Sequence, residues 1–400
     1  MAKVTVRALE NGEDLEEAVA ELRMLVYPYL PEVREAEFYS SVYRWFEEHP
    51  LANQVHRWVA MDGDNVVGHL SATPQYYRIN GRRVVAHTPG DYMVDPAYGF
   101  QAISLMRHFF RTAENCVACD MVPAVIGVQT LLGAEVAGDL SYAAKLIDVS
   151  RLPTPSVPAR LTRLLNRSGT SGNHAPVQSP IEPESPAEPQ GREVPTPRPR
   201  VPLPAPARAL LNGGLRAADV ALGKAFGDSL RVETVEEFDT SFDDLFEKVS
   251  VLVPCVAEKD AAFLRWRYGP DSPQHPVTVL AVREGNELLG YAALKVTIGS
   301  DGYVLDLVRL PGRDDVARAL LRAAISHFRR SGVHLIRYRF LQSPFSAQRS
   351  NLRRMGFFHR TVRHNTLLTK FSDASLHDVA RHTDNWAYNV GDGEASFWTR

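Results

Sequence analysis

Two stretches of the chain repeat one pattern of apolar and polar positions. Residues 56–149 and residues 276–371 each predict strands joined by a hairpin, then a strand, a helix, a strand, a helix and a last strand. The clearest local match lies between residues 59–69 and residues 280–291, where a polar Gly/Asn turn separates two apolar runs. Self-similarity on this scale indicates duplication of one α/β unit.

The turn and helix-end signals agree with this pattern. Asn80-Gly81 between two apolar runs predicts a type I′ hairpin turn. Gly133 and Gly356 each predict the end of the last helix of a copy. In the first copy we expect, in order, strand 3–9, helices 13–29 and 35–48, strand 84–94, helix 100–114, strand 116–122, helix 124–132 and strand 140–149. In the second copy we expect strand 230–238, helices 242–252 and 258–267, strands 277–283, 288–298 and 303–310, helix 315–330, strand 334–341, helix 344–355 and strand 359–371.

A proline-rich segment separates the copies. Fourteen of the 27 prolines fall between Pro153 and Pro206, and such a segment buries too little apolar surface to offset the entropy of ordering. Helical spacing of apolar residues returns over 207–226. We therefore predict a first domain at 1–152, a disordered linker at 153–206, a second domain at 207–372 and a tail at 373–400 that is too aromatic to be wholly disordered.

Composition and charge exclude several classes of function. The chain has 400 residues, 44% hydrophobic and 23% charged, with a net charge of −2. This balance gives no field that attracts nucleic acid or an anionic membrane, and no apolar run has the length of a membrane span. Three cysteines form no disulfide framework, and the N-terminus begins charged, without the apolar core of a signal peptide. We expect a cytoplasmic protein.

One segment of the first copy carries a family resemblance. Residues 92–106 (YMVDPAYGFQAISLM) form a strand that ends in Val-x-Pro, followed by a turn of small residues and a helix. This segment resembles the acyl-CoA segment of the GNAT acyltransferases, and Met355-Gly356-Phe357 resembles the family's helix ending. Residues 260–268 are similar to a helix of tandem GNAT-like proteins. The resemblance implies an α/β fold with a mixed sheet, in two tandem GNAT-like domains, and acetyl-CoA as co-substrate.

The same resemblance implies where acetyl-CoA binds. A helix N-terminus behind a turn of small residues suits a diphosphate, because backbone N–H groups and the helix dipole face it. Gly99, Ala102 and Ser104 depart from the family pattern but remain small. The matching turn of the second copy carries Asp314 and Asp315, which repel phosphate, so we assign the site to the first copy and treat the second as degenerate. The residues predicted to bind acetyl-CoA are Met93, Val94, Gly99, Phe100, Gln101, Ala102, Ile103 and Ser104.

The resemblance also implies catalytic groups. Asp91, on the strand that enters the turn, stands where the family often keeps a group that deprotonates the acceptor, although a strand-end carboxylate can equally be structural. The last helix of the first copy carries no tyrosine to reprotonate the thiolate and offers only Thr130, so Tyr142 on the next strand is the substitute. His69 and His87 are further candidate bases. Cys116-x-x-Cys119 has no second ligand pair, and we expect no metal site.

The sequence predicts transfer of an acyl group, most simply acetyl, from acyl-CoA to an amine or hydroxyl of a small-molecule or sugar acceptor. The acceptor attacks the thioester directly, without a covalent enzyme intermediate. Two alternatives stay open: a catalytically degenerate binding or scaffold protein, and an aminoacyl-tRNA-dependent transferase, which needs a basic patch. The oligomeric state also stays open.

Overall fold

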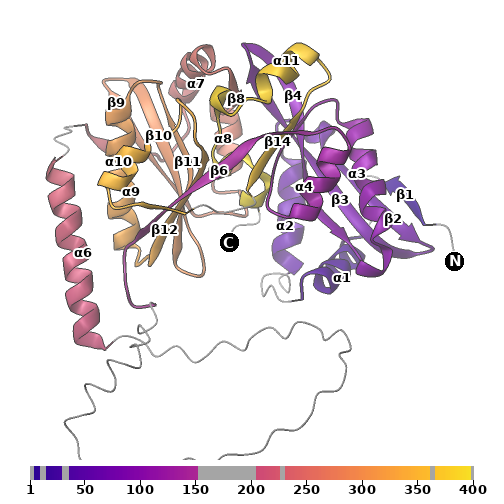
Figure 1. Cartoon of the computed structure of the whole chain (residues 1–400), viewed down its shortest axis with the longest axis horizontal. Helices are drawn as coiled ribbons and strands as arrows, with labels where there is room; N and C mark the ends of the chain where they lie inside the picture. The colour runs from indigo at the N-terminus through magenta and orange to yellow at the C-terminus, as the bar shows by residue number, and fades with distance from the viewer. Residues whose placement is uncertain are drawn as a thin grey trace, which may run out of the picture. The chain divides into compact units, whose positions relative to one another are not determined.

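We describe a computed structural model of the chain (Figure 1). It describes residues 4–9, 15–28, 36–151, 204–225, 230–360 and 365–397. The predicted linker falls mainly on residues 152–203, which lie outside the described residues, as does Trp398 of the tail. Residues 1–148 and 215–400 form one compact unit, and residues 149–214 form a second. The residue limits predicted for the domains stay a prediction.

The first copy follows the predicted order. Its helices and strands are β1 (Thr5–Ala8), α1 (Glu16–Val26), α2 (Ala36–Glu47), β2 (His56–Asp62), β3 (Asn65–Ile79), β4 (Arg82–Val94), α3 (Phe100–Thr112), β5 (Cys116–Asp120), α4 (Pro123–Leu131) and β6 (Glu135–Leu146). Asn80 and Gly81 have φ of 49° and 78°, as the type I′ turn requires. The last strand begins earlier than its apolar pattern predicts, because its polar first half is also paired in the sheet.

The second copy repeats the order, preceded by α6 (Ala205–Ala225). Its elements are β7 (Val232–Thr234), α7 (Thr240–Leu252), β8 (Cys255–Ala257), α8 (Ala261–Tyr268), β9 (Val277–Glu284), β10 (Glu287–Val296), β11 (Asp301–Arg309), α9 (Asp314–Arg330), β12 (Leu335–Leu341), α10 (Arg349–Arg354), β13 (Phe358–Arg360) and β14 (Thr366–Lys370). Predictions differ from the structure at three places. The strand expected at 230–238 spans only Val232–Thr234. The helix expected at 344–355 starts at Arg349, and the strand expected at 359–371 is two strands with different partners.

The described part of the tail is folded. It comprises α11 (Ala374–Ala380), β15 (Trp386–Ala387) and short 3₁₀ turns at Thr383–Asn385, Val390–Asp392 and Glu394–Ser396. The Trp386 side chain is fully buried and donates its indole N–H to the carbonyl of Ala380. No described helix has both the length and the apolar character that crossing a membrane requires.

The two copies exchange their last strands. Described strands join one sheet in the order β1-β2-β3-β4-β5-β14-β6-β12-β11-β10-β9-β7. Thus β14 of the second copy lies beside β5, and β6 of the first copy lies beside β12, both antiparallel. Figure 1 shows the magenta β6 beside strands of the orange half. Each copy therefore completes its sheet with a strand from the other.

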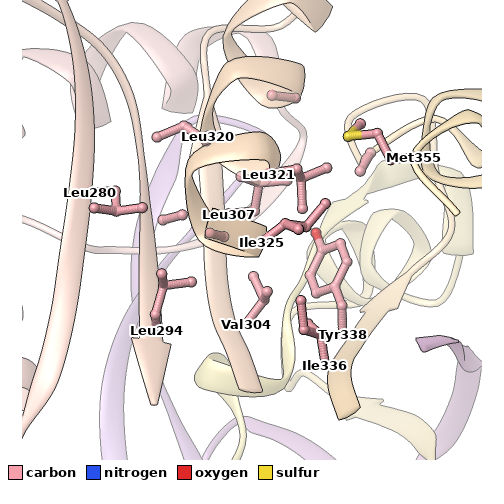
Figure 2. Packing of buried hydrophobic residues seen from close by; sticks show 14 of the residues in the cluster. Leu280, Leu294, Val304, Leu307, Leu320, Leu321, Ile325, Ile336, Tyr338 and Met355 are labelled. Carbon is pink, nitrogen blue, oxygen red and sulfur yellow. The ribbon is translucent and has the colours of Figure 1, made fainter. Parts of the chain in front are cut away.

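Each copy has its own core between sheet and helix. In the second copy α9 places one apolar stripe, which includes Leu320, Leu321 and Ile325, on the strands (Figure 2). In the first copy Leu105, Met106 and Phe109 of α3 pack against strands β2 and β3 in the same way. The 3.6-residue periodicity of both helices positions these stripes.

A tryptophan pair joins the copies at a second place. Trp45 of α2 and Trp266 of α8 stack with ring centroids 4.0 Å apart and planes 4° apart. Each indole N–H donates to the backbone carbonyl of the other tryptophan, at 2.8 and 3.0 Å. An arginine precedes both residues, so equivalent helices of the two copies present the same dipeptide to each other.

We predict that Trp45→Ala lowers the free energy of unfolding by about 3–5 kcal/mol, the usual cost of removing a buried aromatic side chain. Urea unfolding followed by circular dichroism measures it. Because the strands are exchanged, both copies should still unfold in one transition. A variant as stable as the wild type would show that the tryptophan pair contributes nothing to joining the copies.

Candidate functional site

A β-bulge interrupts the pairing of β3 with β4. His69 lies opposite Met93 and Ser71 lies opposite Gly90, so two residues of β4, Asp91 and Tyr92, face one residue of β3. Asp91 has a φ of 45°, a conformation that non-glycine residues rarely adopt. Strained residues of this kind often occur at functional sites, where the surroundings hold them in place.

Three side chains hold the carboxylate of Asp91, whose side chain is 6% exposed. The Arg23 guanidinium of α1 donates to Oδ2 at 2.6 Å and to Oδ1 at 3.3 Å. The hydroxyl of Tyr43, from α2, donates to Oδ2. Nδ1 of His69 lies 3.3 Å from Oδ2 and 2.9 Å from the Asp91 carbonyl oxygen. Helices α1 and α2 are thereby fixed to the bulge.

These contacts set the ionisation of the cluster. Burial alone opposes the charge on Asp91, but Arg23 and the hydrogen bond from His69 outweigh it and hold the pKa of Asp91 well below its usual range. Burial lowers the pKa of His69, so this imidazole is neutral at pH 7. Burial and the Asp91 charge raise the pKa of Tyr43 far above its usual value, so the phenol keeps its proton.

Beyond the bulge the sheet opens between β4 and β5. Within the described residues these parallel strands share one register pair, His87 with Cys116, although β4 continues to Val94 and β5 to Asp120. The Asp91 N–H donates to a carboxylate oxygen of Glu394 from the tail, at 3.1 Å. The structure thus has a wedge between β4 and β5 with a backbone donor at its edge.

Helix α3 begins next to this wedge. Gly99 is its N-cap and makes no side-chain capping hydrogen bond, and its first turn holds no acid. The side chain of Phe100 is 87% exposed, while Gln101, Ala102, Ile103 and Ser104 are half-buried. Tyr92 of the bulge donates its hydroxyl to the Ala102 carbonyl at 2.5 Å. The N–H groups of this first turn are the type of donor that binds anions.

The equivalent helix of the second copy is different. The first turn of α9 carries Asp314 and Asp315, which pair with Arg309 at 2.7 Å and Arg313 at 2.8 Å. These acids place negative charge at the helix N-terminus, where a phosphate would otherwise bind. The two copies therefore differ in their capacity for an anion at this place.

Of the other sequence-predicted residues, Met93 and Val94 directly follow the bulge on β4, and the rest make contacts elsewhere. Tyr142 is buried on β6, and its hydroxyl accepts a hydrogen bond from Arg337 of the second copy at 2.6 Å. Thr130 bonds back to the carbonyl of Ile126 within α4. Burial lowers the pKa of His87 to about 4, and this residue contacts the carbonyl of Gln54. Met93 is buried and Val94 half-buried on β4, at the side of the wedge.

The cysteines are free thiols, buried at Cys116 and Cys255 and half-buried at Cys119. Cys116 and Cys119 carry no disulfide, and burial raises the pKa of Cys119 to about 12. Protonated thiols are poor nucleophiles and poor metal ligands. Among the described residues, no group of three or more His, Cys, Asp or Glu side chains could hold a metal ion.

A pocket of about 440 Å³ lies between α1 and α2. Its lining includes three glutamates, Glu16, Glu17 and Glu21. Arg23 and Tyr43, which also contact Asp91, line it as well. The pocket therefore adjoins the side chains that hold the bulge.

Sequence reasoning missed three residues of this site. Arg23 lies on the buried stripe of α1 together with Val19 and Leu22. An arginine on an apolar stripe is a readable signal of a buried carboxylate partner. Tyr43 lies on the aromatic face of α2, where one tyrosine among other aromatic residues gives no signal of a carboxylate partner. Glu394 lies about 300 residues from Asp91 and carries no local signal at all.

We predict that Arg23→Met costs about 3–5 kcal/mol of unfolding free energy at pH 7, because it leaves a buried carboxylate unpaired. The cost should shrink on acidification, for two reasons. In the wild type, the low pKa of Asp91 gives stability that is present above its ordinary pKa and lost as pH falls below it; in the variant, the pKa rises and protonation relieves the penalty.

Urea unfolding at pH 7 and pH 4 measures this difference. The double variant Arg23→Met/Asp91→Asn is the control and should recover part of the loss at pH 7. An equal cost at both pH values would show that the Arg23–Asp91 charge pair does not stabilise the fold.

Solved structures provide the comparison with known proteins. The chain is similar to a probable N-acyltransferase from Enterococcus faecalis V583 (9% identity, 94% of this chain and 74% of that chain, TM-score 0.53). It is also similar to GCN5-related N-acetyltransferases from Anabaena variabilis (12% identity, 93% and 74%, TM-score 0.52) and Kribbella flavida (13% identity, 93% and 72%, TM-score 0.54). No family model and no curated protein match the sequence. The chain therefore has the GNAT fold, as its sequence predicts.

Proposed function

We propose that the protein transfers an acyl group from acyl-CoA to an amine acceptor, with the acyl-CoA bound in the first copy. The observation that carries this proposal is the unpaired wedge between β4 and β5 beside an uncapped helix N-terminus that lacks acids. The GNAT fold of the neighbouring structures supports acyl transfer in general. Acetyl-CoA is the simplest donor.

Each part of acyl-CoA has a matching group in this site. The diphosphate binds to the N–H groups of the first turn of α3, and the pantetheine arm runs along β4 beyond its register pair with β5. The thioester carbonyl accepts a hydrogen bond from the Asp91 N–H, which polarises it. The amine nitrogen then attacks the carbonyl carbon, the C–N bond forms and the C–S bond breaks. An amine that enters protonated first releases one proton to solvent, because only the neutral nitrogen has a lone pair for the attack. The second proton, lost from nitrogen after the attack, balances the one that the departing CoA thiolate takes up.

The acceptor enters through the pocket between α1 and α2. Its three glutamates favour a cationic acceptor, such as a protonated amine, over a neutral or anionic one. Because Arg23 and Tyr43 line the pocket and contact Asp91, the acceptor reaches the bulge from the helix side.

Asp91 serves this reaction as a positioning residue. A carboxylate with a pKa far below neutral is a weak base, and its oxygens already accept hydrogen bonds from Arg23 and Tyr43. Its contacts fix the bulge, and the bulge aims the backbone N–H at the wedge. The hydroxyl of Tyr142 bonds to Arg337. Tyr142 can act as the acid that protonates the CoA thiolate only where that thiolate lies next to β6.

A second candidate function is binding of acyl-CoA without turnover. It is favoured by the hydrogen bonds that already occupy Asp91 and Tyr142, the two groups expected to move protons. Acetyl-CoA binding together with the absence of acetylated product from a panel of amines would support it. Formation of product with any of these amines would exclude it.

We predict that Ala102→Glu weakens acetyl-CoA binding by about tenfold or more, because it adds a negative charge where the diphosphate binds. Isothermal titration calorimetry measures the affinity. An acid in the first turn stabilises the helix, so the fold should survive. Val316, the matching position of the second copy, is fully buried and makes a poor control.

Thr112→Glu is the matched control. It adds the same charge at an exposed position in the last turn of α3, and acetyl-CoA affinity should stay within about twofold. Equal losses from both variants would point to a general charge effect and remove the assignment of the diphosphate to this helix.

We predict that Asp91→Asn reduces acetyl-CoA affinity and the free energy of unfolding together, because the bulge loses its charged anchor. Calorimetry and urea unfolding give the two quantities. A general base behaves differently: its loss lowers the rate by roughly 10²–10⁴-fold and leaves binding unchanged. The latter pattern would restore Asp91 as the catalytic base.

A further inference from the structure

The tail ends in a segment that lies between the two copies. Residues 389–397, which we call the C-terminal strap, begin at Asn389, whose side chain accepts a hydrogen bond from the Tyr338 hydroxyl at 3.0 Å. Asp392 of the strap then meets a buried lysine, Lys259, at 2.6 Å, and the same lysine pairs with Asp306 of β11 at 2.5 Å. Arg267 donates to the Ser396 hydroxyl at 2.6 Å. The strap is therefore anchored in the second copy.

The middle of the strap lies on the wedge of the first copy. Oε1 of Glu394 accepts the hydrogen bond from the Asp91 N–H. A Cβ on Gly90 would lie 2.5 Å from Cγ of Glu394, so the absence of a side chain at Gly90 lets the Glu394 side chain lie against β4. A Cβ on Gly393 would lie 3.5 Å from Cβ of Cys119 on β5. The strap thus spans the two strands where they are unpaired.

The hydrogen-bond donor that Glu394 occupies is the backbone N–H of Asp91. Under the proposed function, the Asp91 N–H is the group that polarises the thioester carbonyl. One N–H at this position cannot serve a carboxylate and a carbonyl with good geometry at once, and the charged acceptor forms the stronger bond. The thioester must therefore displace Glu394 before it reaches its reactive position.

We propose that the C-terminal strap is an autoinhibitory latch, in which the Glu394 carboxylate competes with the thioester carbonyl of acyl-CoA for the Asp91 N–H. This inference rests on the proposed function. The anchors of the strap at Asp392 and Ser396 lie in the second copy and need not move when Glu394 leaves the Asp91 N–H. Whatever draws Glu394 away, a cationic acceptor included, increases the population that is ready for reaction.

The test compares two ligands that differ only in the competing atom group. Acetyl-CoA has the thioester carbonyl and free coenzyme A lacks it. We expect Glu394→Ala to bind acetyl-CoA roughly ten- to hundred-fold more tightly than the wild type, the equivalent of one hydrogen bond to a charged acceptor. Free coenzyme A should gain much less. Calorimetry on the full chain measures both affinities.

Two control variants separate charge from competition. Glu394→Gln removes the charge but keeps an acceptor oxygen, so acetyl-CoA should gain less than in Glu394→Ala. Glu236→Ala removes an exposed glutamate of the second copy and should change neither affinity. Amide hydrogen exchange gives a readout that does not depend on activity: acetyl-CoA should keep the Asp91 amide protected in the wild type and in Glu394→Ala alike.

The failures of the two proposals are distinguishable. If the wild type binds acetyl-CoA and Glu394→Ala binds it no better, the latch is overturned and the proposed function stands. An equal gain for acetyl-CoA and free coenzyme A overturns the latch as well, since charge repulsion then explains it. If neither protein binds either ligand, the proposed function fails and the latch fails with it.

Discussion

The exchange of β6 and β14 is the constraint on which the rest of the structure depends. Because β14 closes the first copy and β6 closes the second, neither copy has a complete sheet without the other. The same exchange holds β5 along one edge, where it pairs with β14. Along its other edge, β5 separates from β4 after a single register pair. The wedge thus lies between a strand held by its own copy and a strand held by the other copy.

Both copies have an aspartate beside a β-bulge, but the contacts of this aspartate differ between the copies. Counting back from the helix-side ends of β4 and β11, Asp91 and Asp306 occupy equivalent positions, and a bulge lies next to each. In the first copy, Arg23 and His69 hold the aspartate and leave its backbone N–H at the wedge. In the second, Lys259 holds it and the strap covers it, with room beside Leu305 only for Gly391. Duplication followed by divergence of the partners explains why the tail reaches Asp91 through a single backbone hydrogen bond but is anchored through a lysine at Asp306.

The sequence predicts the elements well and their partners poorly. The hairpin at Asn80-Gly81, the helix ends at Gly133 and Gly356 and the stripe of α9 follow from local rules, and the structure has all of them. Strand exchange leaves no local trace, because nothing in the sequences of β6 and β14 specifies which of the two sheets each strand completes. Asp91 was identified by its place before the turn, but its ionic partner comes from α1 and the occupant of its N–H from the tail. Long-range contacts of this kind leave no periodic pattern and no motif in the sequence. The contact with Arg23 holds the pKa of Asp91 low, and for this reason we propose a positioning role for Asp91 in place of the role of a base.

A crystal structure of the chain with acetyl-CoA tests the central claim most directly. The account predicts the diphosphate at the N–H groups of residues 100–102, the pantetheine arm along β4 and the thioester carbonyl on the Asp91 N–H, with Glu394 moved aside. Acetyl-CoA bound at the N-terminus of α9 in the second copy, or bound outside the wedge with Glu394 still on Asp91, would contradict it.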